Sequence, residues 1–211
     1  MKIKVCGITR LEDLETLSRL GADYAGLIFY ERSPRYMGHL LQGADVKKTA
    51  PKLARVGVFV NETLEGVLDK VTGYGLQLVQ LHGDESPEYC ATLAQYVPVI
   101  KAFRIGDTVN WDTLKPYAHI VDYFLFDTAS KAAYGGTGHQ FNWAVLDTYP
   151  FDVPFFLSGG IGAEETGALR ALRWPHLYAV DVNSRFETAP GVKDLSAVQA
   201  FIGALSSTQN Q

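Results

Sequence analysis

The sequence is poor in cysteine and contains no long hydrophobic run. Among its 211 residues only Cys6 and Cys90 are cysteines. A disulfide-stapled fold is therefore excluded, and a reducing compartment, the cytoplasm, is the expected location. No stretch reaches the roughly 18 uncharged apolar residues of a membrane span. The first residues, 1–6, lack the apolar core of a secretory signal. We therefore expect no association with a membrane.

Neither sign of charge dominates. Lys and Arg together number 19 against 23 Asp and Glu, which gives a formal net charge of −4. Binding to nucleic acid requires basic surface to replace phosphate counterions, so this balance argues against a nucleic-acid partner. With 47% hydrophobic and 20% charged residues the composition is that of a globular protein. The length favours one domain over residues 1–211, in which only the polar stretch Ser206–Gln211 is expected to be a flexible tail.

Short runs of apolar, β-branched and aromatic residues recur along the chain, separated by stretches long enough for helices. This alternation predicts a parallel sheet with right-handed crossovers. Eight such units in about 200 residues favour an α/β fold that is a single closed (β/α)8 TIM barrel. A doubly wound open sheet is the alternative, but its usual nucleotide fingerprint is absent. The predicted strands span Lys2–Cys6, Tyr24–Phe29, Arg55–Val60, Leu76–Leu81, Val97–Phe103, Asp122–Asp127, Val153–Leu157 and Leu177–Val182.

The helix signals differ in strength. Thr9 has the spacing of a capping box with Glu12, and Gly21 is well placed to end that helix. Ser86, followed by proline and an acidic residue, predicts a second helix start. A short and weak helix is expected over Thr108–Tyr117, because a proline lies near its end. Amphipathic helices are also predicted over Glu62–Val71, Phe141–Thr148, Ala163–Leu172 and Asp194–Leu205.

Cys6 ends the first strand, and the strand ends of a parallel barrel form the face on which chemistry takes place. Alternation along this strand places Lys4 and Cys6 inward and Val5 outward, toward the helices. A free thiol can become a base when nearby cations lower its pKa, and we predict a lowered pKa for Cys6. The alternative, a small buried hydrophobe, is equally common for a free cysteine. Cys90 lies within a helix pattern and is expected to be inert.

Asp127 ends the sixth predicted strand, after four apolar residues. Partial desolvation at such a position favours the protonated carboxyl, which can then donate a proton. A loop or capping role is the alternative for this carboxylate. Strands one and six of a closed barrel face the same cavity, so Cys6 and Asp127 can act on one substrate. One base and one acid suit an aldose–ketose isomerisation.

Two segments of small residues follow the seventh and eighth predicted strands. Glycines at the start of a helix expose backbone N–H groups, which form a ready anion site. Barrels often hold a phosphate at these two positions. The candidate phosphate ligands are Ser158, Gly159, Gly160, Asp181, Asn183 and Ser184.

Other loops carry further candidates. Arg32 and Arg35 follow the second strand, and a guanidinium there can grip a planar carboxylate or remain a solvated charge. The glycine-rich loop after the sixth strand is typical of a mobile flap, or simply of a flexible loop. The histidines have no metal-ligand spacing, so no metal site is expected. The candidate substrate-loop residues are His82, Gly136, Thr137 and Gly138.

Taken in order, these motifs resemble one enzyme family. The opening Lys4-Val5-Cys6-Gly7-Ile8-Thr9 resembles that of phosphoribosylanthranilate isomerase, and the resemblance covers essentially the whole chain. The further matching segments are Ser33-Pro34-Arg35, Val58-Phe59-Val60-Asn61, Gln80-Leu81-His82-Gly83, Phe126-Asp127, Gly136-Thr137-Gly138 with Phe141 and Trp143, Leu157-Ser158-Gly159-Gly160-Ile161, Asp181-Val182-Asn183-Ser184 and Pro190-Gly191-Val192-Lys193-Asp194.

The resemblance implies a single barrel and an Amadori rearrangement in tryptophan biosynthesis. N-(5-phosphoribosyl)anthranilate would become 1-(2-carboxyphenylamino)-1-deoxyribulose 5-phosphate, without a metal or organic cofactor. The family's general base falls on Cys6, its general acid on Asp127 and its arginine for the anthranilate carboxylate on Arg35. Its phosphate loops fall on residues 158–160 and 181–184. The chain departs from the pattern at Arg185-Phe186, where a Gly-Val pair is common. Arg185 can add a contact to the phosphate or point into solvent, and we expect solvent.

Three alternatives remain at this stage. The histidine-pathway isomerase performs the same chemistry on the same fold, but it uses two aspartates where Cys6 provides the first group here. Its substrate also carries two phosphates, so a second anion site would be needed. Indoleglycerol-phosphate synthase relies on a longer N-terminal extension. A catalytically silent sugar-phosphate-binding protein is the alternative outside enzymes. The sequence leaves open whether the protein is a monomer or a homodimer.

Overall fold

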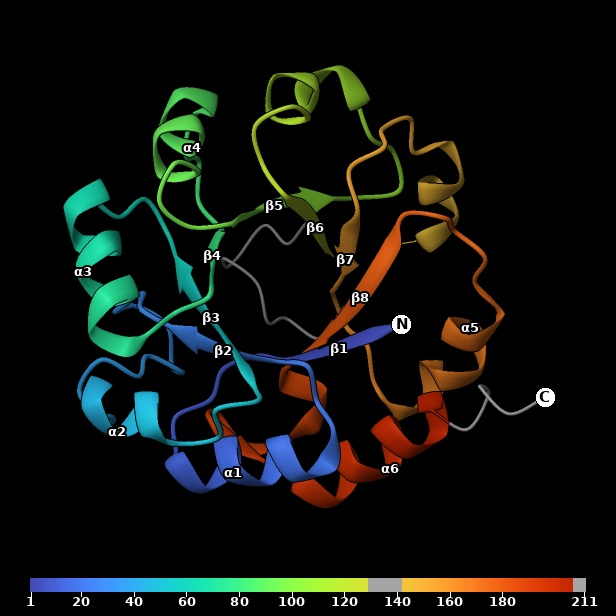
Figure 1. The fold of residues 1–211 in the computed structure, drawn as a ribbon. Helices are drawn as coiled ribbons and strands as arrows, with labels where there is room; N and C mark the ends of the chain where they lie inside the picture. Colours follow the sequence, from blue (N-terminus) through green and yellow to red (C-terminus); the bar gives the residue numbers. More distant parts are fainter. Residues whose placement is uncertain (129–141, 207–211) are drawn as a thin grey trace.

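In the computed structural model, which describes residues 1–128 and 142–206, eight parallel strands close into one barrel (Figure 1). Each strand pairs with its neighbour in sequence, and β1 closes the ring by pairing in parallel with β8. The predicted α/β fold, a TIM barrel, is confirmed. The barrel strands are β1 Lys2–Val5, β2 Tyr24–Ile28, β3 Ala54–Phe59, β4 Leu78–Leu81, β5 Val99–Ile105, β6 Tyr123–Thr128, β7 Phe155–Leu157 and β8 Leu177–Val182.

The helices form an outer layer around this ring (Figure 1). Helices α1 and α6, from the two ends of the chain, lie side by side and close that layer. No helix among the described residues is long and apolar enough to cross a membrane. The helices are α1 Leu11–Leu20, α2 Gly43–Lys48, α3 Leu64–Tyr74, α4 Pro87–Leu93, α5 Thr166–Ala171 and α6 Leu195–Ser206.

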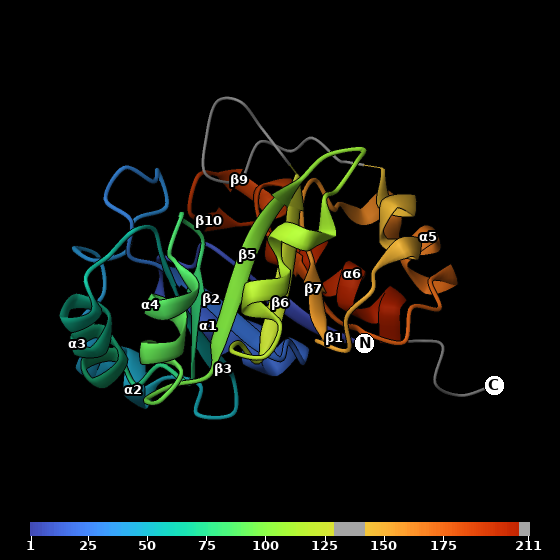
Figure 2. The ribbon, with the colours of Figure 1, turned by 90° about the horizontal axis from the view of Figure 1, so that it is seen from above.

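A small antiparallel hairpin follows the barrel's last strand. It consists of β9, Glu187–Ala189, and β10, Val192–Lys193. Figure 2 shows the hairpin at the end of the barrel toward which the strand arrows point. The hairpin therefore borders the face where the strands end. The sequence pattern does not predict this hairpin, because its two short strands carry no apolar run.

Side-chain alternation divides the apolar residues into two cores. One cluster lies in the barrel interior, where aromatic rings pack edge to face, as Tyr24 and Phe156 do with ring centroids 5.6 Å apart. A larger cluster lies between the strands and the helices and includes Ile3 and Val5. The alternate residues, Lys4 on β1 and Cys6 directly after it, therefore point into the barrel, as predicted. The residues of the inner cluster are Tyr24, Val56, Leu78, Ile100, Ala102, Leu125, Phe156 and Ala179.

Two helix-end predictions are confirmed and one is wrong. Gly21 ends α1 in the left-handed conformation, and the Ser86 hydroxyl caps α4 by accepting from the Tyr89 N–H. Thr9, however, does not cap α1. Its hydroxyl donates to the Gly191 carbonyl oxygen at 2.6 Å, and the residue at the cap position is Arg10. A contact with a distant loop takes the place of the local capping box.

Other helices are shorter than predicted. Thr108–Tyr117 contains only two 3-10 turns, Trp111–Thr113 and Lys115–Tyr117, because Pro116 has no N–H for a longer helix. Within Phe141–Thr148 the described part is a 3-10 helix over Trp143–Thr148, whereas Phe141 lies outside the described residues. The six-residue helix α2 was missed. The predicted loop Gly136, Thr137 and Gly138 and the tail residues 207–211 also lie outside the described residues.

Candidate active site

Cys6 follows β1 and is buried at the top of the barrel interior. Its N–H donates to the Val182 carbonyl oxygen at 2.8 Å, which fixes it to β8. Gly26 on the neighbouring strand leaves the room that the sulfur needs, because a Cβ there would lie 2.6 Å from Sγ. Gly7, next along the chain, has φ +75°, and a Cβ there would meet the side chains of Asn183 and Arg35. Gly26 thus leaves space for the thiol, and Gly7 leaves space for Asn183 and Arg35.

Lys4 lies on the same inward face as Cys6 and is fully buried. Its Nζ donates to Asp181 Oδ2 at 2.8 Å. Burial alone would lower the pKa of Lys4, but Asp181 and Cys6 raise it above its ordinary value, so the ammonium is retained. A positive charge therefore lies inside the barrel beside the thiol.

The prediction of a lowered pKa for Cys6 is wrong. Burial raises the pKa of the Cys6 thiol above its ordinary value, and the opposing charges of Lys4 and Lys193 do not outweigh it. Asp181 adds to the increase, because its carboxylate lies near the sulfur. The sequence placed cations near the thiol but could not reveal how completely the barrel removes it from water.

Asp127 is the last residue of β6 whose side chain points into the barrel, and it is buried. Its Oδ1 accepts from the Thr128 N–H at 2.8 Å, and its Oδ2 lies 3.4 Å from Nε2 of His82. His82 Nδ1 in turn lies 2.8 Å from the amide nitrogen of Gln80. A Cβ on Gly159 would meet Asp127 Oδ1 at 3.1 Å, so the glycine turn approaches the carboxylate closely. The structure therefore brings His82 and the loop after β7 to Asp127.

Arg35 follows the Ser33-Pro34 turn, in which the Ser33 hydroxyl accepts from the Arg35 N–H. Its guanidinium grips the Glu187 carboxylate through Nε at 2.9 Å and Nη2 at 2.7 Å. Glu187 also accepts from Lys193 Nζ at 2.7 Å, and Lys193 reaches Asn183 Oδ1 at 2.8 Å. This partly buried network joins the loop after β2 to the hairpin. Nη1 of Arg35 is not among the atoms that Glu187 binds.

The Arg35 and Lys193 side chains determine the ionisation of Glu187. Burial alone would raise the pKa of Glu187, but hydrogen bonds and charge from these two cations hold it below its ordinary value. Burial lowers the pKa of Lys193 despite the carboxylate. Glu187 therefore stays ionised and holds Arg35 in one orientation.

Consecutive positive φ angles shape the loop after β7. Gly159 has φ +91° and Gly160 φ +67°, conformations that favour glycine and leave backbone N–H groups turned out of the strand. The Ser158 N–H still pairs with β6, donating to the Phe126 carbonyl oxygen at 2.8 Å. The helix predicted to follow is divided into a 3-10 turn, Ala163–Glu165, and the short α5. The anion site predicted for this loop would thus rest on its backbone rather than on a long helix.

The residues at the end of β8 and in the loop that follows it have different environments. The Asp181 carboxylate faces the barrel interior, and the Asn183 side chain is committed to Lys193. Ser184 begins the 3-10 turn that follows. Arg185 is exposed, as predicted, and pairs at the surface with Glu164 of the preceding loop. Phe186 is buried against Phe201 of α6, with ring centroids 4.9 Å apart.

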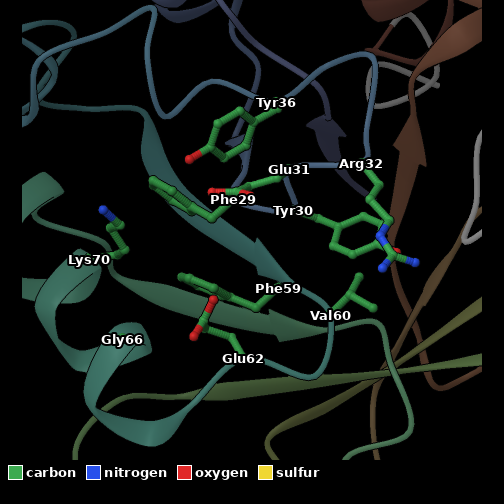
Figure 3. Close-up of a pocket in the computed structure, with 10 residues that line it drawn as sticks. All are labelled: Phe29, Tyr30, Glu31, Arg32, Tyr36, Phe59, Val60, Glu62, Gly66 and Lys70. Atoms are coloured by element: carbon green, nitrogen blue, oxygen red, sulfur yellow. The ribbon is translucent and has the colours of Figure 1, made fainter.

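Arg32 takes no part in the Arg35 network. It lines a separate cavity of about 420 Å³ between the loop after β2 and the start of α3. Figure 3 shows Arg32 and Lys70 at opposite ends of this cavity, with the rings of Phe29 and Phe59 between them. Those two rings stack at 5.1 Å. Of the predicted residues only Arg32 lines this cavity, so we do not assign it to the active site.

No group of three or more His, Cys, Asp or Glu residues that could hold a metal ion occurs in the part of the chain that the structure describes. Sequence reasoning missed the buried polar residues that organise the site. Strand alternation could have pointed to Lys4 and Gln80, because both lie on inward-facing positions. No local signal could have paired Glu187 with Arg35, which is 152 residues away along the chain.

Known proteins are similar to this chain in both sequence and fold. The family model of N-(5'-phosphoribosyl)anthranilate (PRA) isomerase matches residues 3–204. The chain belongs to the phosphoribosylanthranilate isomerase family. It is an isomerase of tryptophan biosynthesis, as that family is. The isomerase of Parabacteroides distasonis is 42% identical over 206 residues, covering 96% of this chain and 92% of that protein. That of Phocaeicola vulgatus is 41% identical, covering 97% and 98%.

Solved structures of phosphoribosylanthranilate isomerases have the same fold. The Thermotoga maritima enzyme has a TM-score of 0.85 and 34% identity, covering 98% of this chain and 99% of that one. The Thermus thermophilus enzyme has a TM-score of 0.84 and 33% identity, with the same coverage. A further isomerase structure, with a TM-score of 0.82 and 33% identity, holds reduced 1-(o-carboxyphenylamino)-1-deoxyribulose 5-phosphate; it again covers 98% of this chain and 99% of that one.

Proposed function

We propose that this chain converts N-(5-phosphoribosyl)anthranilate into 1-(2-carboxyphenylamino)-1-deoxyribulose 5-phosphate, with Asp127 as general acid and Cys6 as general base. The proposal depends above all on one observation: both groups end inward-facing rows of the same barrel, at the face where its strands end. The ligand of the related isomerase structure, a reduced form of the proposed product, supports the choice of substrate.

Asp127 acts first, by protonating the furanose ring oxygen. The bond from C1 to that oxygen breaks, and the nitrogen lone pair forms a protonated imine at C1. Loss of its proton leaves Asp127 as a carboxylate that still accepts from the Thr128 N–H. A positioned proton donor of this kind contributes on the order of 10²–10⁴ in rate.

Cys6 acts second, as the thiolate that removes the proton from C2. The electrons of that C–H bond form the C1–C2 double bond, and the imine nitrogen recovers its lone pair. The resulting enolamine gains a proton at C1 while its C2 hydroxyl loses one, so that the C2–O bond becomes the carbonyl of the ketone. The positive charge of the protonated imine adds to those of Lys4 and Lys193, which favour the thiolate against the effect of burial. The ionised form of Cys6 is thus favoured at the step that needs it.

The ends of the substrate bind the loops around this pair. The Nη1 side of Arg35 is turned to the anthranilate carboxylate, because Glu187 holds Nε and Nη2. The backbone N–H groups around Gly159 and Gly160 take the phosphate, with Ser184 of the next loop. Asp181 contributes through Lys4 rather than by touching the phosphate, since two anions would repel each other. This binding holds the sugar between acid and base.

The test is a fluorescence assay with phosphoribosylanthranilate generated in place. The natural protein should turn it over, and Cys6→Ala and Asp127→Asn should each lower kcat at least about a hundredfold. Cys90→Ala is the matched control: it removes the other buried thiol, which lies in α4 outside the barrel, and should keep catalysis. If the folded natural protein does not turn over phosphoribosylanthranilate, the assignment is overturned.

We also propose the cytoplasm as the compartment, because both cysteines are free.

A further inference from the structure

Gln80 is a buried amide that the mechanism above does not use. It lies on β4 one inward position above Leu78, and only 1% of its surface is exposed. A polar side chain in a barrel interior costs free energy unless it is hydrogen-bonded. Its amide nitrogen lies 2.8 Å from Nδ1 of His82, whereas its Oε1 has no partner among the described residues. Among the described residues, the hydrogen bond with His82 is therefore the one that this amide makes.

The structure points the amide nitrogen of Gln80, not its oxygen, toward Nδ1 of His82. An amide nitrogen can only donate a hydrogen bond. The nitrogen therefore donates to Nδ1. Nδ1 must then be unprotonated, so a neutral His82 carries its proton on Nε2.

The Nε2–H of His82 lies 3.4 Å from Asp127 Oδ2, longer than a good hydrogen bond. Hydrogen bonds at catalytic groups are often long in the free enzyme and shorten as charge develops. The other oxygen of Asp127 already accepts from the Thr128 N–H at 2.8 Å. When Asp127 gives up its proton, each of its two oxygens therefore faces one N–H donor.

We propose that Gln80 is a positioning residue for the acid step, which fixes the Nε2–H tautomer of His82 so that the ring donates to Asp127 as this group becomes a carboxylate. This inference rests on the proposed function of Asp127. The interaction strengthens only as Asp127 loses its proton, so it lowers the barrier rather than tightening substrate binding. Loss of Gln80 should consequently lower kcat and leave KM nearly unchanged.

The tautomer can be measured directly, without substrate. The chain has five histidines, and ¹⁵N NMR of histidine-labelled protein distinguishes a protonated from an unprotonated ring nitrogen; His82→Asn identifies the His82 signals. In the natural protein we expect Nε2 protonated and Nδ1 unprotonated. In Gln80→Leu the two tautomers should mix. In Gln80→Glu the carboxylate can only accept, so the proton should move to Nδ1.

Activity provides the second readout. Gln80→Leu and Gln80→Glu should both lower kcat about 10- to 100-fold with KM changed less than about twofold. The matched control is Gln77→Leu: that glutamine bonds the Arg55 N–H at the start of β3, and its loss should leave both tautomer and kcat unchanged. Urea unfolding of each variant establishes that it is folded, and Gln80→Glu keeps the test available if the leucine variant is unstable.

Two results would overturn the inference. One is a natural protein in which His82 carries its proton on Nδ1. The other is a folded Gln80→Leu variant with unchanged kcat. Because the tautomer is read without substrate, these results differ from failure of the proposed function, which would appear as a folded natural protein that does not turn over phosphoribosylanthranilate.

Discussion

Replacing Gly26 by alanine tests whether the position of the Cys6 sulfur limits the reaction. An alanine Cβ at this position would lie 2.6 Å from Sγ and 2.9 Å from Cα of Cys6. Ordinary contact begins at 3.4 Å, so the sulfur must move by about 0.8 Å, and the backbone carbon cannot swing aside. A misplacement of about 1 Å can cost on the order of 100-fold in rate. Overfilling a packed interior costs about 1–3 kcal/mol of unfolding free energy.

We therefore expect Gly26→Ala to lower kcat/KM about 100-fold in the fluorescence assay and to lower the free energy of unfolding by about 1–3 kcal/mol in urea. The control is Gly73→Ala in α3, where the new Cβ would have no atom within 4 Å apart from its chain neighbours and the backbone of its own helix. That change should stabilise the protein by about 0.5–1 kcal/mol and leave kcat/KM unchanged. A folded Gly26→Ala variant with natural kcat/KM would refute the reasoning, because the sulfur would then tolerate displacement.

Three further predictions follow from the buried polar residues and the eighth loop. Lys4→Met removes a cation that opposes the effect of burial, so the pKa of the Cys6 thiol should rise further, measured by alkylation against pH in a Cys90→Ser background. An unchanged thiol pKa would contradict this. Glu187→Gln should cost about 3 kcal/mol of unfolding free energy at pH 7, because it strips Arg35 and Lys193 of their carboxylate. Since the folded state holds the pKa of Glu187 below its ordinary 4.5, that stabilisation is complete above pH 4.5 and is lost as the pH falls below it. Urea curves of the two proteins should converge in acid, and a constant difference would count against the ion pair. Phe186→Ala should cost about 3–5 kcal/mol in the same assay, because the ring is buried on α6, whereas a loss below about 1 kcal/mol would place the ring outside the core.

The barrel could be predicted because each strand carries its own apolar signal. The predicted Leu177–Val182 matches β8 at both ends, and the other seven predictions overlap their strands with small shifts at the ends. The helical layer was less predictable. Thr9 has the local pattern of a cap, but its hydroxyl bonds Gly191 instead, a contact that sequence neighbours cannot reveal. Pro116 reduced a predicted helix to short 3-10 turns.

The candidate site, too, could be predicted only in part. Positions of Cys6 and Asp127 at inward strand ends follow from alternation and from the closed barrel. Their environments do not, because the ionisation of Cys6 depends on its complete burial and on Asp181, far along the chain. The pairing of Arg35 with Glu187 likewise depends on the hairpin after β8, which carries no strand signal of its own. Local patterns thus place the reactive groups, and long-range contacts set their chemistry.

The most direct test of the central claim compares two pH profiles of the same protein. One is the rate of Cys6 alkylation in a Cys90→Ser background, which reports the thiolate fraction. The other is kcat/KM for phosphoribosylanthranilate, which reports the ionisation of the base in the free enzyme. If Cys6 is the base, kcat/KM should rise through the same apparent pKa as alkylation, and Lys4→Met should move both profiles upward together. A kcat/KM that stays flat across the titration of the thiol would contradict the account.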